Sequence, residues 1–100
     1  MENMHFMIKY PPKRPTFAQD MTEAEREIMG RHIAYWTDLM DRGHVLVFGP
    51  VQAPGGFYGL GIVEADSEEQ IRAFIQDDPA IRAGLMNTEF HPMQAIVPKK

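Results

Sequence analysis

The segment from Arg31 to Pro50, RHIAYWTDLMDRGHVLVFGP, limits the possible folds more than any other part of the chain. An amphipathic helix over its first half places His32 on the apolar side. Gly43 suits the left-handed residue just past a helix end, and the apolar run His44–Phe48, closed by Gly49-Pro50, predicts a strand. A histidine that faces the interior needs an explanation, because burying an ionisable group without a partner is costly.

Three helix starts can be read from the sequence. Thr22–Glu25 is a capping box that opens the helix carrying His32, which should run to about Arg42. Ser67–Gln70 is a second capping box, and the helix that it starts should extend through about Gln76. Asp78-Pro79 then suits the N-cap and first residue of a separate short turn that ends at Gly84.

Apolar runs with period-two character predict four strands, and turn residues separate them. Prolines that follow the first strand predict a loop as far as Asp20 or Thr22, and Pro54-Gly55-Gly56 predicts a hairpin loop. The predicted strands are Met4–Tyr10, His44–Phe48, Phe57–Ala65, and a last one from Leu85 or Asn87 to about Val97 that bends at His91-Pro92. The order strand, helix, strand, strand, helix, strand predicts an α+β, ferredoxin-like βαββαβ fold, with an antiparallel sheet and both helices on one face.

The second face of this sheet is too apolar to be left in water. In Val45–Phe48 both strand parities are apolar, and Leu60 and Ile62 alternate with glycines and Val63. A face exposed to solvent should alternate with polar residues, and contiguous apolar patches mark interaction sites. The simplest cover is a second copy of the chain, so we expect a homodimer with the two sheets facing each other.

Composition excludes several function classes. One hundred residues predict a single domain over 1–100, and 44% hydrophobic residues argue against disorder. The net charge is −4 and no basic run is longer than a pair such as Lys99-Lys100, so nucleic acid is not an expected partner. Without cysteine there can be no disulfide, thiolate zinc site, iron–sulfur cluster or cysteine nucleophile. No signal peptide or run of roughly 20 apolar residues is present, which predicts a cytoplasmic protein without membrane association.

An ordered set of short motifs along nearly the whole chain resembles the YCII-related (YciI-like) family. The matching pieces are HFMIKY at the start, Arg31-His32 with Tyr35, Gly43, Phe48-Gly49-Pro50, Gly56, Asp78-Pro79, Gly84-Leu85 and Pro92. The resemblance implies a single YCII-related domain that dimerises into an α/β barrel. It also implies a pocket in which a histidine and an aspartate lie close together as candidate catalytic groups. By position these are His32 and Asp78, although the doubled Asp77-Asp78 leaves open which carboxylate faces the pocket, and the loop from Pro11 to Asp20 is longer than the resemblance leads us to expect.

His32 is the centre of the predicted site. An imidazole exchanges protons near neutral pH, and a neighbouring carboxylate would orient it and stabilise its charged form. A core histidine bonded to a backbone carbonyl is the alternative interpretation. Tyr35 and Trp36 could form walls for a flat ring, or could belong to the core, and Arg31 could reach an anionic ligand or simply pair with Glu27.

No metal or cofactor is predicted. The four histidines are scattered and show no HxH or HExxH spacing, which argues against a metal site. Ser67 is the only serine, and its capping role accounts for it, which argues against a serine catalytic triad. The function that we expect is general acid–base chemistry on a small organic substrate, a lactone or ring compound, with His32 moving the proton and Asp78 setting its tautomer. The alternatives are a ligand-binding or assembly module without turnover, and a cofactor-free oxygenase whose substrate itself activates oxygen.

Overall fold

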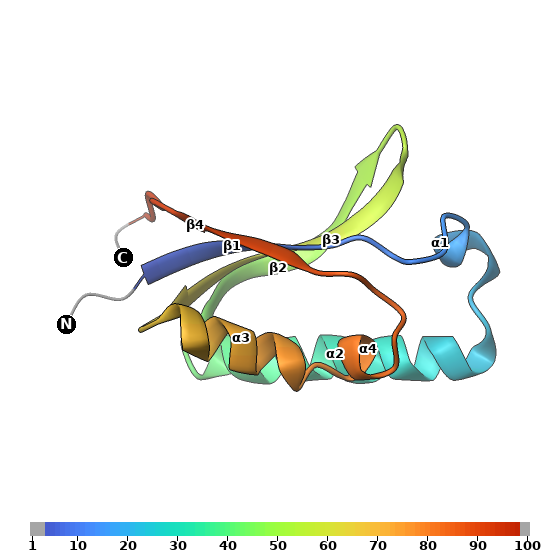
Figure 1. Cartoon of the computed structure of the whole chain (residues 1–100), viewed down its shortest axis with the longest axis horizontal. Coiled ribbons are helices and arrows are strands. Elements are labelled where there is room, and N and C mark those ends of the chain that lie inside the picture. Colours follow the sequence, from blue (N-terminus) through green and yellow to red (C-terminus); the bar gives the residue numbers. More distant parts are fainter. Residues whose placement is uncertain (1–3, 99–100) are drawn as a thin grey trace.

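A four-stranded antiparallel sheet covered on one face by helices makes up the computed structural model, which describes residues 4–98 (Figure 1). The strand order is β2-β3-β1-β4. The strands are β1 (Met4–Tyr10), β2 (Val45–Ala53), β3 (Gly56–Ala65) and β4 (Glu89–Met93). The helices are α1 (Phe17–Asp20), α2 (Glu23–Asp41), α3 (Glu68–Gln76) and α4 (Pro79–Arg82). The predicted α+β, ferredoxin-like βαββαβ fold is confirmed, with α1 and α4 as short additions.

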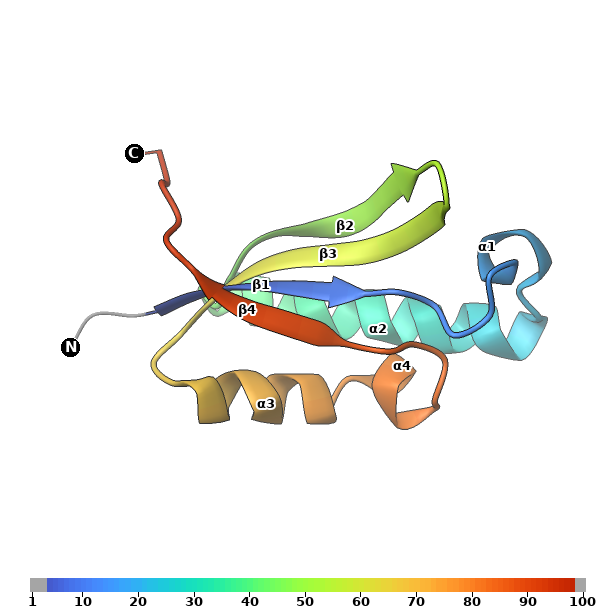
Figure 2. The same ribbon diagram turned by 45° about the horizontal axis from the view of Figure 1, so that its top comes forward.

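The core lies between the sheet and helices α2, α3 and α4, which run along the same face (Figure 2). The central strand β1 shows why, because Phe6, Ile8 and Tyr10 are buried while the residues between them are partly exposed. Successive side chains of a strand point to opposite faces, so this alternation directs one face of β1 toward the helices. Among the described residues, no helix is both long enough and apolar enough to cross a bilayer.

Helix α2 begins as the sequence predicts. The Thr22 hydroxyl accepts from the Glu25 amide at 3.1 Å, and the Glu25 carboxylate accepts from the Thr22 amide at 2.9 Å. The helix ends at Asp41 and is followed by Gly43, whose φ of 90° is in the region that glycine adopts without strain. The helix that carries His32 therefore has fixed ends.

Only half of the second predicted capping box forms. The Ser67 hydroxyl accepts from the Gln70 amide at 3.1 Å, as predicted. The Gln70 side chain does not return to Ser67 but accepts from the Asp66 amide at 2.8 Å. Both contacts still satisfy amide groups near the start of α3, which otherwise have no partner within the helix.

Two predicted strands have wrong boundaries, and one predicted loop contains a helical turn. Strand β2 continues past Gly49-Pro50 to Ala53. Strand β4 contains Pro92 but begins at Glu89 instead of Leu85 or Asn87, and ends at Met93 instead of Val97. Both are edge strands, where a proline can leave its missing amide on the unpaired side. The proline-rich loop after β1 also contains a helical turn, α1, whose Phe17 is buried.

Candidate active site: a buried His–Asp pair beside an apolar cavity

Asp78 is a fully buried carboxylate at the start of α4. As N-cap it accepts from the Ala80 amide through Oδ1 at 2.9 Å, and Pro79 occupies the first helical position. The same carboxylate accepts from the Trp36 indole Nε1 at 2.7 Å and lies 2.9 and 2.8 Å from His32 Nδ1 through its two oxygens. A buried charge is tolerated where it is well hydrogen-bonded, and here three donors converge on it.

Helix α2 brings two of these donors together. His32 and Trp36 are four residues apart, so they lie on one face of the helix, and both are buried. A carboxylate only accepts hydrogen bonds, so the proton between His32 and Asp78 belongs to Nδ1. In the neutral imidazole, Nε2 therefore carries the free lone pair, and within residues 4–98 it makes no hydrogen bond.

A cavity of about 400 Å³ lies between α2 and the sheet, next to His32. Its walls are almost entirely apolar and contain no acidic or basic residue other than His32 and Tyr10 among the described residues. Ile33 and Pro50 on its lining are exposed to solvent. The lining residues are Ile8, Tyr10, Met21, Met29, His32, Ile33, Trp36, Phe48, Gly49, Pro50, Phe57, Gly59, Leu60, Gly61, Val63 and Met86.

The cavity owes its volume to two glycines of β3 that face the helices. A Cβ at Gly59 would lie 3.3 Å from the Tyr10 Cβ, and a Cβ at Gly61 would lie 3.6 Å from the Phe48 Cβ. Tyr10 and Phe48 both belong to the cavity lining, so the missing side chains would point into it. A glycine inside a strand often marks a close approach of another group to the backbone.

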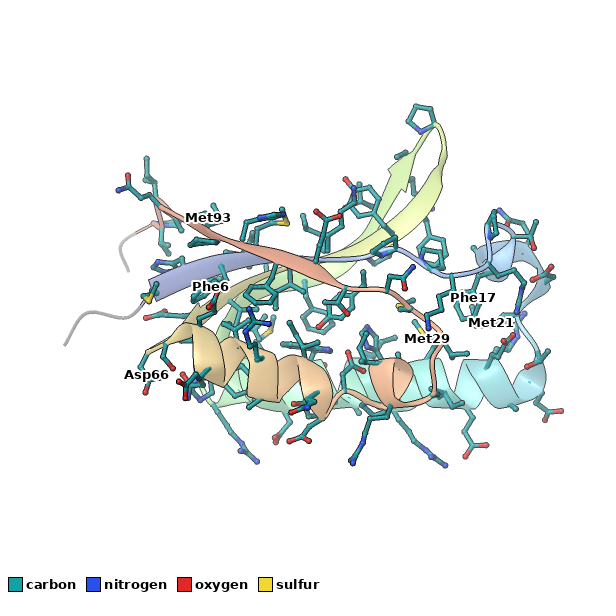
Figure 3. All side chains as sticks on the ribbon, viewed as in Figure 1. Phe6, Phe17, Met21, Met29, Asp66 and Met93 are labelled. Carbon is teal, nitrogen blue, oxygen red and sulfur yellow. The ribbon has the colours of Figure 1, made fainter. Side chains whose placement is uncertain are left out.

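The segment between β1 and α2 forms one end of the cavity wall. The Phe17 ring stacks on Phe57 with centroids 6.4 Å apart, and Met21 and Met29 both line the cavity; Figure 3 shows Phe17, Met21 and Met29 at the α1 end of α2. Arg14 ties this segment down through ion pairs of 2.8 Å to Asp20 and 2.9 Å to Glu25.

Tyr10 completes the polar end of the site. Its ring packs edge-to-face on His32, with centroids 5.5 Å apart, and on Trp36, with centroids 5.9 Å apart. Burial, with the nearby negative charge of Asp78, raises the pKa of the Tyr10 hydroxyl far above its ordinary value, so the group stays protonated. No partner within the described part of the chain accepts or donates a hydrogen bond at this buried hydroxyl.

Of the other predicted site residues, Tyr35 and Arg31 lie apart from the cavity, whereas Trp36 lines it. Tyr35 is not among the lining residues; its hydroxyl donates to the Phe74 carbonyl at 2.6 Å, and burial raises its pKa to about 12. Arg31 is exposed and pairs with Glu27 at 2.6 Å. Asp77 is the exposed C-cap of α3, whereas Asp78 is the carboxylate next to His32, and Trp36 both lines the cavity and donates to Asp78.

Several cavity residues were not among the predicted site residues. Tyr10 has the inward parity of Phe6 and Ile8 on β1, and this pattern could have identified it as a site residue. Met21 and Met86 come from irregular segments whose course no periodicity predicts. Across residues 4–98, no group of three or more histidine, aspartate or glutamate side chains could hold a metal ion.

Comparison with known proteins agrees with this architecture. The structure is similar to 5-chloro-2-hydroxyhydroquinone dehydrochlorinase (TftG) from Burkholderia phenoliruptrix AC1100, solved in complex with 2,5-dihydroxybenzoquinone. The two share 24% sequence identity with a TM-score of 0.68, over 89% of this chain and 93% of the other. No curated protein matches the sequence. The family model of the YCII-related domain, however, matches residues 4–93 of this sequence. The chain therefore belongs to the YCII-related family.

Proposed function

We propose that this protein is an enzyme that uses His32 as a general base and acid on a small ring compound, with Asp78 as its partner. The observation that carries the proposal is the one-sided pairing of His32. Its Nδ1 is held by a fully buried carboxylate, and its ring lines a cavity large enough for a small molecule. A base that is oriented on one edge and free on the other is the arrangement that proton transfer requires.

Each member of the pair has a defined part in the chemistry. His32 Nε2 accepts a proton from a C–H or O–H group of the bound substrate, and the negative charge of Asp78 stabilises the imidazolium that forms. The imidazolium then returns the proton to another atom of the substrate or to a leaving group. Such catalysis typically supplies about 10²–10⁴-fold, which suits isomerisation or elimination better than amide hydrolysis.

The cavity lining indicates an uncharged ligand with a large apolar surface. The lining holds no lysine or arginine, so a carboxylate or phosphate would have no counter-charge among the described residues. The solved structure of the dehydrochlorinase contains a dihydroxylated ring, 2,5-dihydroxybenzoquinone. That likeness supports the choice of a hydroxylated ring or a lactone as the substrate of this chain.

The test is turnover of a panel of lactones and hydroxylated aromatic compounds by wild type and by His32→Asn. We expect the substitution to lower kcat by about 10²–10⁴-fold while most of the folding stability remains. His44→Asn is the matched control, because His44 lies outside the cavity lining and its ring contacts Phe74 instead. Equal activity of the wild type and the His32 variant on a substrate of the panel would rule out the proposal. Loss of folding in the His32 variant would instead favour the core-histidine interpretation.

We also propose that a second copy of the chain covers the open face of the sheet. Val47 lies opposite Ile62, Ile62 lies opposite Met7, and Met7 lies opposite His91, so one row crosses all four strands. Val47 is 57% exposed, and the exposed Met93 and Leu46 lie on the same two edge strands. This extent of exposed apolar surface supports an interface, and two-fold pairing is the commonest way to bury one.

The non-catalytic alternative makes a different prediction for the panel. A binding or assembly module would bind ring compounds, or form the dimer, without turning any compound over.

A cytoplasmic location stays a prediction from the sequence, and cell fractionation would test it.

A further inference from the structure

The Tyr10 hydroxyl is buried without a hydrogen-bond partner, and the fold alone gives no reason for it. Tyr10 is 4% exposed, and its ring already packs on His32 and Trp36. A phenylalanine would keep those contacts without burying a polar group. A buried hydroxyl that makes no hydrogen bond costs about 1–3 kcal/mol, so keeping the oxygen here lowers stability.

The position of Tyr10 connects this cost to the cavity. Its ring lines the same cavity as His32, and the two rings touch edge to face. Protonated as it is, the hydroxyl can donate a hydrogen bond, whereas the free Nε2 of neutral His32 can only accept one. The polar end of the cavity is therefore lined by two touching rings, one carrying an acceptor and the other a donor.

We propose that Tyr10 is a specificity-determining residue that donates a hydrogen bond to a carbonyl-type oxygen of the ring ligand. His32 Nε2 takes the ligand's own hydroxyl or C–H proton, so the pair selects rings that carry both an acidic hydrogen and an acceptor oxygen. This inference rests on the proposed function and narrows its substrate class to hydroxylated ring ketones, quinones and lactones.

Surrounding side chains cover the hydroxyl oxygen, and Met86 is the one that we expect to move. Met86 bridges to Pro12, two residues after Tyr10, and its side chain lines the same cavity. An unbranched thioether side chain adapts its shape more easily than a branched one. The proposal therefore requires a lining side chain such as Met86 to shift when the ligand binds.

The experiment compares two ligands of similar shape, 4-hydroxyacetophenone and 4-ethylphenol, in binding titrations with the whole protein. We expect Tyr10→Phe to weaken binding of the ketone by about tenfold, the effect of losing one well-placed hydrogen bond, and to leave 4-ethylphenol unchanged. The Tm of the variant should equal or exceed that of wild type, because the unsatisfied hydroxyl is gone. Tyr58→Phe is the matched control, since Tyr58 faces Lys9 outside the cavity lining and should leave both affinities unchanged.

The outcomes separate this inference from the proposed function. Equal ketone affinity for wild type and Tyr10→Phe, or a clearly lowered Tm in the variant, overturns the role of Tyr10. If His32→Asn abolishes turnover while Tyr10→Phe changes nothing, only this inference fails. If wild type binds neither compound and turns over no member of the panel, both proposals fail together.

Discussion

At the scale of single residues, Asp78 belongs to two structures at once. One oxygen caps α4 through the Ala80 amide, and both oxygens lie within hydrogen-bond distance of His32. The cap fixes the carboxylate by local geometry, so its direction toward His32 does not depend on a flexible loop. A side chain that is positioned by its own helix start is well suited to hold an imidazole in one tautomer.

Glu25 provides a pH-dependent contribution to stability. Hydrogen bonds from Arg14 and from the Thr22 amide lower its pKa from 4.5 to about 2. Since the folded pKa lies below the unfolded value, the charged group stabilises the folded state above about pH 4.5, and this contribution is lost as the pH falls through about 2. We expect Glu25→Gln to be less stable than wild type at pH 7 and equally stable near pH 2, as measured by urea unfolding across this range. A difference that is constant with pH would contradict the assignment.

The two members of the central pair could each be identified from the sequence, whereas their contact and their surroundings could not. His32 falls on the apolar side of α2 by helical period, and Asp78 before Pro79 is an N-cap by residue type. No pattern in the sequence brings residues 32 and 78 together; the resemblance to the family suggested that contact. The Trp36 donor and the unpaired Tyr10 hydroxyl depend on side-chain packing between elements, which periodicity does not describe.

At the scale of elements, helices were predicted more accurately than edge strands. Capping residues act within a few positions of the chain, so Thr22 and Gly43 mark the limits of α2 closely. Pro50 and Pro92 stop a strand only where their missing amide would face a neighbour, and both lie on edge strands. Whether a strand lies at an edge is decided by topology, and so local signals could not set these boundaries.

Helix α2 contains a position where stability can be improved. Gly30 is exposed in the middle of the helix, and a Cβ built there has no neighbour within 4 Å. Gly30→Ala should raise the free energy of unfolding by about 0.5–1 kcal/mol, because alanine loses less backbone entropy in a helix. Gly43→Ala is the contrasting variant, since its φ of 90° should make the same change destabilising. Thermal unfolding of both variants tests the pair, and equal shifts would contradict it.

At the scale of the whole molecule, the two faces of the sheet differ in how they are covered. The face carrying Phe6 is buried by helices, while Met93 lies on the opposite face (Figure 3). Ion-pairing groups such as His5 and Glu64, 3.9 Å apart, also lie on β1 and β3. A sheet face that combines a row of apolar side chains with ion-pairing side chains is closer in composition to a protein–protein interface than to a hydrophobic core.

A substitution at Val47, in the apolar row that crosses the open face of the sheet, tests the proposed dimer. We expect wild type to sediment as a dimer at micromolar concentration, and Val47→Glu to sediment as a monomer, because a carboxylate at this position would be buried without a partner. Ala34→Glu, on an exposed position of α2, should leave the dimer intact. A monomeric wild type would contradict the proposal directly.

The two glycines of β3 that face the helices have a consequence for how such a protein could diverge. The cavity exists because Gly59 and Gly61 have no side chains, while His32 lies on α2 and Asp78 is the N-cap of α4. A methyl group at Gly61 would meet its neighbours at ordinary contact distances, from 3.6 Å outward, so the fold could accept it. Descendants of this chain could therefore change the volume of the cavity by one mutation in a strand, without any change in the His32–Asp78 pair.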